Sequence, residues 1–280
     1  MADLRTPFTS AVGTLKVDGR PARHGVIHLL LTLWLCTLFV MPIPLLAAIT
    51  ASNLTTGVAS SVSSQATASV SLADSKLNTL CVRNNLAGTP NTPTATSSSR
   101  TWTQVGTGTN GANTNRMTCF RSMGSAATEA VTIDFAGQSQ SVVCWALEEF
   151  TGMKTSGSNG ADAIVANTGS LTSNVVTYVT GTNTGNSQTL AALSNANNAS
   201  YGFVCNSTNN TVTVGSGYTV LASATATASR KSEYLVPGST TVDFTWSSAA
   251  ITSGMTAIEI AVATAATGGS HSLGLLGVGR

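Results

Sequence analysis

The chain of 280 residues is long enough for one large domain or two small ones, and its 42% apolar content is compatible with a packed core. Only 9% of the residues are charged, far below the usual share of about a quarter. This low charge argues against a disordered chain, because disordered chains usually combine low hydrophobicity with high net charge.

The charge is unevenly distributed along the chain. Residues 1–24 carry four basic and two acidic side chains, a net charge of +2, whereas residues 51–280 carry nine of each, a net charge of zero. The main body therefore lacks the basic surface that nucleic-acid binding requires, and we expect no nucleic-acid partner.

A hydrophobic segment begins at Val26 and ends at Leu46. Its 21 residues approach the length of roughly 20 that crosses a bilayer as a helix, and prolines at 42 and 44 end or kink that helix. The basic residues precede it, so the positive-inside rule places the rest of the chain outside the cytoplasm.

The fate of this segment is left open by the sequence. The stretch LLAAITAS offers several alanines but no clean A-x-A cleavage pattern, so we prefer an uncleaved membrane anchor to a cleaved signal. A segment buried in a larger particle is the third alternative. The anchor and the signal both export the body.

We expect four parts. Residues 1–24 form a basic arm, residues 25–48 a transmembrane or signal helix, residues 49–264 a β-sandwich domain, and residues 265–280 a flexible C-terminal tail.

The body consists of short alternating segments separated by stretches rich in Gly, Asn and Ser, which is typical of an antiparallel β-sandwich. No repeat of 20 to 50 residues is evident. We expect surface loops at 86–100 and 106–115. Strands are predicted at 64–73, 76–84, 101–107, 116–123, 129–137, 141–152, 162–169, 173–181, 199–207, 211–217, 218–230, 232–236, 240–248 and 255–263.

Two of these segments show clear periodicity, and a third contrasts with them. In EAVTIDFAG, Val131, Ile133 and Phe135 share one face, and TTVDFTWSS alternates in the same way. SVVCWALEEF is apolar on both faces, which favours a central strand covered on each side.

Several short stretches carry a family resemblance: SQATASVSLADSKL, TPNTPTATSSSRTWTQV, EEFTGMKTSGSNG, YGFVCNST and AIEIAV. Over about residues 47–264 the chain resembles phage-encoded and metagenomic β-sandwich proteins of virion surfaces, tail appendages or cell surfaces. The resemblance implies a jelly-roll-like or immunoglobulin-like sandwich and brings no catalytic motif. The basic arm and the hydrophobic segment fall outside it.

The body offers little for catalysis. The three histidines, at 24, 28 and 271, lie outside it, which removes Ser-His-Asp and Cys-His catalysis and histidine metal sites. Glu148 and Glu149 point to opposite faces of one strand, so they cannot flank one glycosidic bond. We expect one of the body's carboxylates to meet Arg116 or Arg121, and we expect no catalytic residue, metal or cofactor.

The body contains four cysteines in mid-strand, at Cys81, Cys119, Cys144 and Cys205, each among apolar neighbours. We favour buried thiols, because free cysteine behaves as a small hydrophobe. One disulfide across facing strands is the alternative in an oxidising compartment.

Two aromatic residues border flexible polar stretches and are the surface candidates for ligand binding: Trp102 and Tyr218. We expect a non-enzymatic structural or binding module of the phage virion-surface or appendage type. It would present loops to a host-surface glycan or to neighbouring virion subunits. The alternative is a membrane-anchored or secreted bacterial carbohydrate-binding or adhesin domain.

Overall fold

The computed structural model describes residues 48–109, 113–165, 176–179, 184–225, 228–247 and 252–264. These residues are all-β with antiparallel sheets, as predicted, and they fall within one compact unit, Leu46–Arg280. The basic arm, the segment 26–46 and the tail 265–280 lie outside the described residues. Within the described ranges, no helix is long and apolar enough to cross a membrane.

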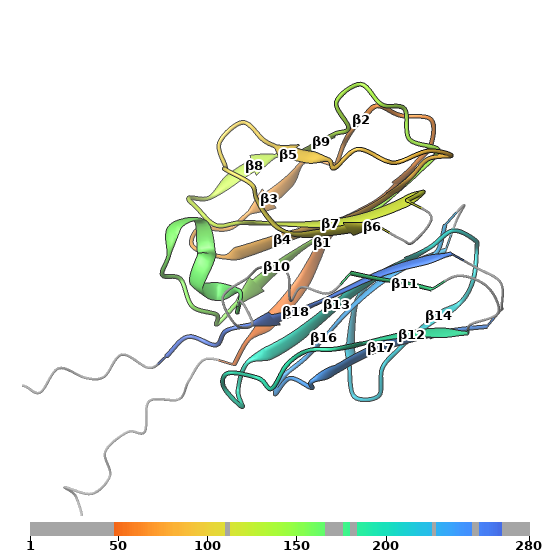
Figure 1. Ribbon diagram of the computed structural model, residues 1–280. Helices are drawn as coiled ribbons and strands as arrows, with labels where there is room; N and C mark the ends of the chain where they lie inside the picture. Colours follow the sequence, from red (N-terminus) through yellow and green to blue (C-terminus); the bar gives the residue numbers. More distant parts are fainter. Residues whose placement is uncertain are drawn as a thin grey trace, which may run out of the picture. The chain divides into compact units, whose positions relative to one another are not determined.

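The first half of the body, residues 48–153, contains ten strands (Figure 1). Its first large sheet has the order β1-β10-β4-β7-β6, its first small sheet has the order β2-β9-β5, and β3 pairs with β8. The strands are β1 Thr50–Ala59, β2 Ser64–Ala66, β3 Val70–Leu72, β4 Leu77–Asn85, β5 Thr94–Thr96, β6 Thr103–Thr109, β7 Asn115–Ser122, β8 Ala127–Glu129, β9 Thr132–Asp134 and β10 Val142–Thr151.

The second half comprises the described residues from 176 to 264 and follows a short 3-10 helix, η1, Ser158–Ala163. Its second large sheet has the order β11-β18-β13-β16-β15, and its second small sheet has the order β12-β17-β14. The strands are β11 Val176–Val179, β12 Gly185–Thr189, β13 Ala199–Asn206, β14 Val212–Val214, β15 Thr219–Ala224, β16 Arg230–Leu235, β17 Thr241–Trp246 and β18 Ser253–Ile260.

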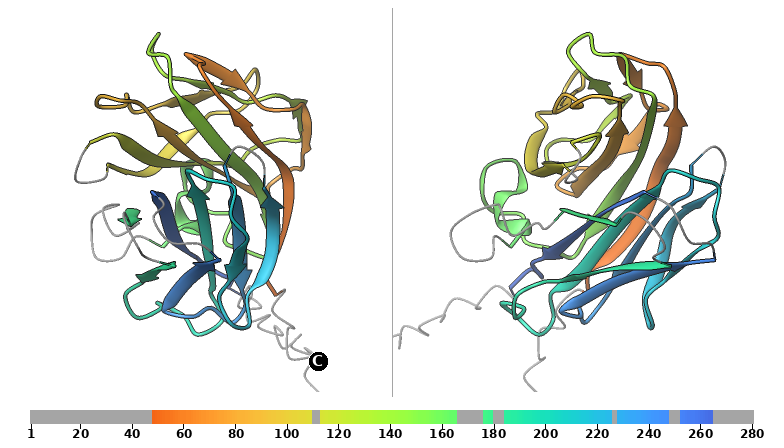
Figure 2. Two further views of the ribbon diagram at one scale, coloured as in Figure 1. Left: turned by 90° about the vertical axis from the view of Figure 1, so that its right-hand side faces the viewer. Right: turned by 45° about the vertical axis from the view of Figure 1, so that its right-hand side comes forward.

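The sheets stack in layers, with the two large sheets face to face in the middle (Figure 2). We call this contact the central interface; its core includes Phe150, Tyr201 and Phe203. A second core, with Phe135, lies between the first large and small sheets. A third, with Phe244, lies between the second large and small sheets. Each large sheet is therefore buried on both faces.

The predicted alternation is confirmed where it was clearest. Val131, Ile133 and Phe135 are fully buried, whereas Asp134 on the opposite face is exposed. Strand β10 lies between β1 and β4 and contributes residues to two cores, as expected of a central strand covered on each side.

Four strands were not predicted: β1, β5, β8 and β12; the predicted strand 129–137 contains β9 and only the last residue of β8. They lack a clean apolar alternation, because β1 is an edge strand, β5 and β12 are short edge strands of small sheets, and β8 has three residues that pair only with β3. The predicted strand 64–73 is two strands, β2 and β3. Between them the Thr67 hydroxyl accepts a hydrogen bond from Val131 N, which ends the first pairing.

The predicted strand at 162–169 is wrong over its described start. Residues up to Ala163 belong to η1, where Asn159 and Gly160 have positive φ angles of 53° and 72°. Asn159 holds this turn in place, because its side chain donates to Thr101 O and accepts from Met123 N. Residues 166–169 lie outside the described residues.

Candidate functional site

The body has a basal end, at which the described chain both begins and finishes. Thr50 at the start of β1 pairs with Thr151, and Ala263 N donates to Gly152 O at 2.9 Å. The opposite end, which we call the distal end, carries only loops. In Figure 1 the basal end is marked by η1 on the left, and the distal loops lie on the right.

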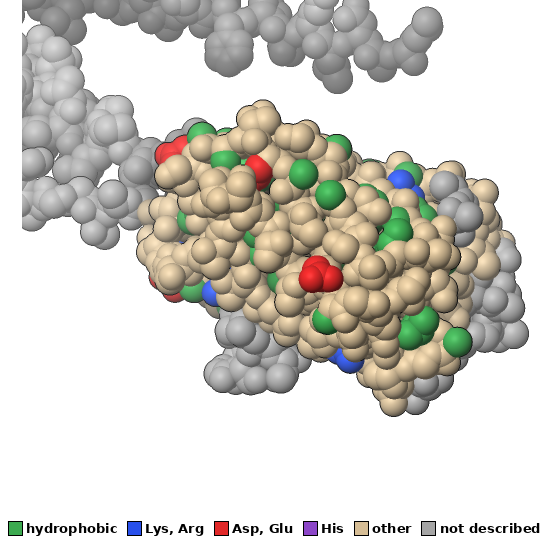
Figure 3. Space-filling view, turned by 90° about the horizontal axis from the view of Figure 1, so that it is seen from above, with side chains coloured by type: hydrophobic (Ala, Val, Ile, Leu, Met, Phe, Trp, Pro, Cys, Tyr) green, Lys and Arg blue, Asp and Glu red, His purple; other side chains and the backbone are tan. Residues whose placement is uncertain are grey.

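The described distal loops come from both halves of the body. They are residues 60–63, 86–93, 113–114 and 135–141 of the first half, and residues 184, 207–211, 225, 228–229, 247 and 252 of the second half. None of these residues is charged, whereas the basal loops carry Asp74, Lys76, Arg100, Lys154 and Asp162. The face in Figure 3 also shows only scattered charges over the first small sheet. The described distal loops therefore present hydroxyl, amide and small side chains without a charge of their own, and Arg116 of β7 lies beside them, since it donates to Pro90 O.

Buried amides brace the distal loops of the first half. Asn84 donates to Gln140 Oε1 at 3.0 Å, and Gln140 donates to Gln138 Oε1 at 2.8 Å. Gln138 Oε1 also accepts from Asn91 N at 2.6 Å, and Asn91 donates to Phe135 O at 3.0 Å. Loops 86–93 and 135–141 therefore hold each other in one arrangement.

Backbone hydrogen bonds do the same in the second half. Asn206 N donates to Ser229 O at 2.8 Å, Ser229 N donates to Thr208 O at 3.1 Å, and Ser207 N donates to Thr252 O at 2.9 Å. Within each half the described distal loops are thus fixed to one another, which lowers the entropy that a partner would have to remove on binding.

The predicted loop 86–100 is two loops at opposite ends of the body. Strand β5 crosses its middle and separates residues 86–93 at the distal end from residues 97–102 at the basal end. At the basal end Glu129 accepts hydrogen bonds from the hydroxyls of Ser97, Ser98 and Ser99. These hydrogen bonds hold the pKa of Glu129 below its usual value, although burial opposes them.

A basal hollow of about 340 Å³ is lined by residues that include Ser99, Arg100, Thr103 and Asn159. Arg100 supplies its charge, but its guanidinium donates to Asn78 Oδ1 and to the backbone oxygens of Ala73, Gly124 and Ser125. Its donors therefore hold loops together and do not point to a ligand.

The two aromatic candidates for ligand binding lie away from the distal end and are engaged by the protein. Trp102 is half-buried against the first-half core and donates to Ser97 Oγ at 3.0 Å. Tyr218 is 9% exposed and its hydroxyl hydrogen-bonds Ser200 Oγ and Thr241 O, both at 2.8 Å. The structure does not bring these two rings together.

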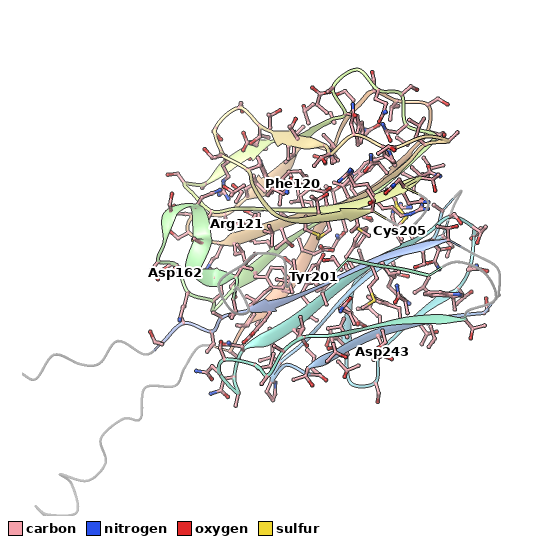
Figure 4. The ribbon with its side chains drawn as sticks, viewed as in Figure 1. Phe120, Arg121, Asp162, Tyr201, Cys205 and Asp243 are labelled. Carbon is pink, nitrogen blue, oxygen red and sulfur yellow. A yellow bond between two sulfur atoms is a disulfide. The ribbon has the colours of Figure 1, made fainter. Side chains whose placement is uncertain are left out.

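Glu148 and Glu149 point to opposite faces, as their spacing predicted, but neither contacts Arg116 or Arg121. Glu148 is fully buried in the central interface, where it accepts from Tyr201, Ser232 and Asn53. Tyr201 is labelled between the large sheets in Figure 4. Burial raises the pKa of Glu148 to about 7, and the three hydrogen bonds oppose that rise.

The expected arginine contacts are replaced by backbone contacts. Arg116 Nε donates to Pro90 O at 3.0 Å, and Arg121 Nε donates to Asn159 O at 3.3 Å. Burial lowers the pKa of Arg121. Glu149 instead accepts from Ala73 N at 2.9 Å, so the expected ion pair is wrong.

The four body cysteines form two disulfides, where the sequence favoured thiols. Cys81 and Cys119 are directly opposite each other on β4 and β7. Cys144 on β10 is bonded to Cys205 on β13, which links the first half to the second across the central interface. A facing pair of this kind was the alternative that the sequence left open.

Among the described residues, no three His, Cys, Asp or Glu side chains gather closely enough to hold a metal ion. Their buried carboxylates are instead used in loop and sheet contacts. The distal loop surface is the candidate functional site, and only its 86–93 and 113–114 loops were indicated by the sequence. No family model, curated protein or solved structure matches the chain.

Proposed function

We propose that this protein is a non-enzymatic, exported structural or binding module of the phage virion-surface or appendage type. It presents its distal loops for attachment to a host surface or for contact with neighbouring subunits.

One observation carries the proposal: the basal and distal ends of the body differ in the charge of their loops. The chain joins and leaves the body at the charged basal end, and the opposite end carries braced, uncharged loops from both halves. A body held at its base would direct this distal surface outward. Loops positioned by a rigid scaffold are the usual place for recognition.

We also propose that each half is a β-sandwich of the jelly-roll-like or immunoglobulin-like kind. In each half a five-stranded sheet and a three-stranded sheet enclose a separate hydrophobic core, which supports this fold. Two disulfides support export, because disulfides form and persist in oxidising compartments.

A second function is favoured by the segment from Val26 to Leu46, which ends two residues before the described body begins at Ala48. If this segment stays in a membrane, the same body is a cell-surface adhesin or carbohydrate-binding domain with its distal end facing away from the cell. Export and the distal binding surface are common to both functions.

The test adds one charge to an exposed serine at either end. Bacteria carrying the full chain at their surface are measured for adhesion to host-type cells and to beads coated with neutral polysaccharide. We expect Ser139→Lys, at the distal end, to reduce adhesion at least tenfold and Ser156→Lys, at the basal end, to leave it unchanged. Equal effects of the two variants would contradict the proposal.

Mass spectrometry of sedimented particles separates the two functions. Repeated copies of the chain in particles support the virion module, whereas recovery only in the membrane pellet supports the anchored adhesin. Hydrolysis of a polysaccharide by the purified protein, lost in Glu149→Gln, would refute both.

A further inference from the structure

The two halves of the body have the same strand order. In the large sheets, β1-β10-β4-β7-β6 corresponds position by position to β11-β18-β13-β16-β15. In the small sheets, β2-β9-β5 corresponds to β12-β17-β14. Eight strands therefore recur in the same order along the chain and in the same places in space.

The registers of the small sheets also correspond. Ser64 pairs with Asp134 on β9, and Ser187 pairs with Asp243 on β17; each serine is followed by a glutamine, and each aspartate by a fully buried phenylalanine. One residue beyond the end of each of these strand pairings, a backbone hydrogen bond occurs at the same position in both halves. It runs from Thr67 N to Val131 O at 2.9 Å and from Leu190 N to Thr240 O at 2.7 Å.

A glutamate clamp recurs at the basal end of each half. In each half a glutamate on the second strand of the large sheet, β10 or β18, accepts a backbone N–H from the loop that precedes the neighbouring strand. It also accepts an asparagine amide, which comes from within β4 in the first half and from the residue before β13 in the second. In the first half the three residues are Glu149, Ala73 and Asn78, and in the second half they are Glu259, Ser194 and Asn198. Glu149 therefore corresponds to Glu259.

These glutamates fix which residues correspond in the large sheets. Glu149 is paired with Asn78, and Glu259 with Ser200, so Arg83 corresponds to Cys205 and Cys144 corresponds to Gly254. The numbering differs by 122 along β4 and β13 (200 minus 78) and by 110 along β10 and β18 (259 minus 149).

Across the central interface, the halves contact each other reciprocally. Strand β1 lies against β15 while β6 lies against β11, and β10 lies against β16 while β7 lies against β18. Arg83 Nη1 contacts the sulfur of Cys205, its own counterpart, at 3.9 Å, and the hydroxyl of Thr79 lies beside that of its counterpart, Tyr201. Contacts between counterparts occur where two identical units meet at a two-fold axis.

We infer that the two halves are copies of one unit. We further infer that the face of each large sheet in the central interface is a surface made to pair with a second copy of that unit, about a two-fold axis running along β4 and β13. This inference is independent of the proposed function.

Differences between the halves favour the pairing of a first half with a second half. The bridge from Cys144 to Cys205 has no reciprocal, because the corresponding residues are Gly254 and Arg83. The position of Glu148 is occupied by Ile258 in the second half, so its buried hydrogen bonds also occur once. Such one-sided contacts favour the pairing of first half with second half over pairing of like halves.

The test restores the missing bridge in the full chain. We expect Arg83→Cys combined with Gly254→Cys to form a third disulfide in the body, seen as a linked peptide in a non-reducing map and as protection from alkylation. Arg83→Cys combined with Met255→Cys is the matched control. Met255 faces the third core, so this pair should stay unlinked. Free thiols at 83 and 254 in a protein that retains the native bridges would overturn the inference.

A second measurement decides the matter if the double variant does not fold. Phe135 and Phe244 are counterparts and both are fully buried. By hydrogen exchange of the full chain, Phe135→Ala should speed exchange mainly in β9 and β10, and Phe244→Ala mainly in β17 and β18, at least tenfold in each case. Equal loosening of both halves by either variant overturns the inference.

Discussion

Replacing Glu148 with glutamine should remove part of the pH dependence of stability. The pKa of this carboxyl is about 7 in the folded protein, against an ordinary value of 4.5, chiefly because it is fully buried. The folded state therefore binds the proton more tightly than the unfolded state, and the stability gained from it is complete below pH 4.5 and lost as the pH rises through 7.

The size of this effect follows from the shift. A difference of about 2.5 pH units at about 1.4 kcal/mol per unit corresponds to roughly 3.5 kcal/mol in full, of which about 3 kcal/mol falls between pH 4.5 and pH 8. Glutamine has nearly the same shape and carries no charge; its Oε1 can accept from Ser232 and Asn53, and its Nε2 can donate to the Tyr201 hydroxyl. At pH 4.5 we therefore expect the free energy of unfolding of Glu148→Gln to be no higher than that of wild type. Between pH 4.5 and pH 8 the difference between the two proteins should shift by about 3 kcal/mol in favour of the variant.

The assay is urea denaturation of both proteins between pH 4.5 and pH 9. Glu233, whose pKa is raised to about 8 chiefly by burial, contributes its own pH dependence, but it is present in both proteins and cancels in the difference. A difference between wild type and variant that stays constant from pH 4.5 to pH 8 would refute the reasoning.

Two further predictions concern the disulfide and a close approach in the sheet. Cys144→Ser with Cys205→Ser opens a loop with a sequence separation of 61 and should cost about 4 kcal/mol in the free energy of unfolding by the chain-entropy estimate, measured by denaturation against the oxidised wild type. An unchanged midpoint would show that the bridge does not constrain the chain. Gly57→Ala should lower stability by about 1–3 kcal/mol, because its Cβ would lie 2.0 Å from the Trp145 ring. Gly88→Ala is the control, since nothing lies within 4 Å of its Cβ.

The strands with a clean period of two could be predicted from the sequence because their burial is one-sided. Phe135, Phe244 and Trp246 each face a core from a small sheet whose other face is solvated, so apolar and polar residues must alternate. Strand β1 follows no such rule. It is an edge strand, half-buried along most of its length, and TASNLTTGVA meets that requirement without alternation.

The candidate site was predictable only in its composition. The Ser, Thr, Asn and Gly of the distal loops identify them as loops, but which loops meet depends on the strand order. The same limit applied to the cysteines: Cys81 and Cys119 are 38 residues apart in the sequence, yet directly opposite each other in the sheet. Apolar neighbours on either side are equally compatible with a thiol and with a buried bridge.

The correspondence of the two halves was hidden for a related reason. The spacing from Gln65 to Phe135 is 70 residues and that from Gln188 to Phe244 is 56, because the loops between them differ in length. Core positions constrain volume and polarity more than identity, so Leu80 in one half corresponds to Gly202 in the other while both face their own small sheet. What the halves share is pairing register and a few polar contacts, such as the clamps at Glu149 and Glu259. Those contacts are recognisable only when the partner of each strand is known.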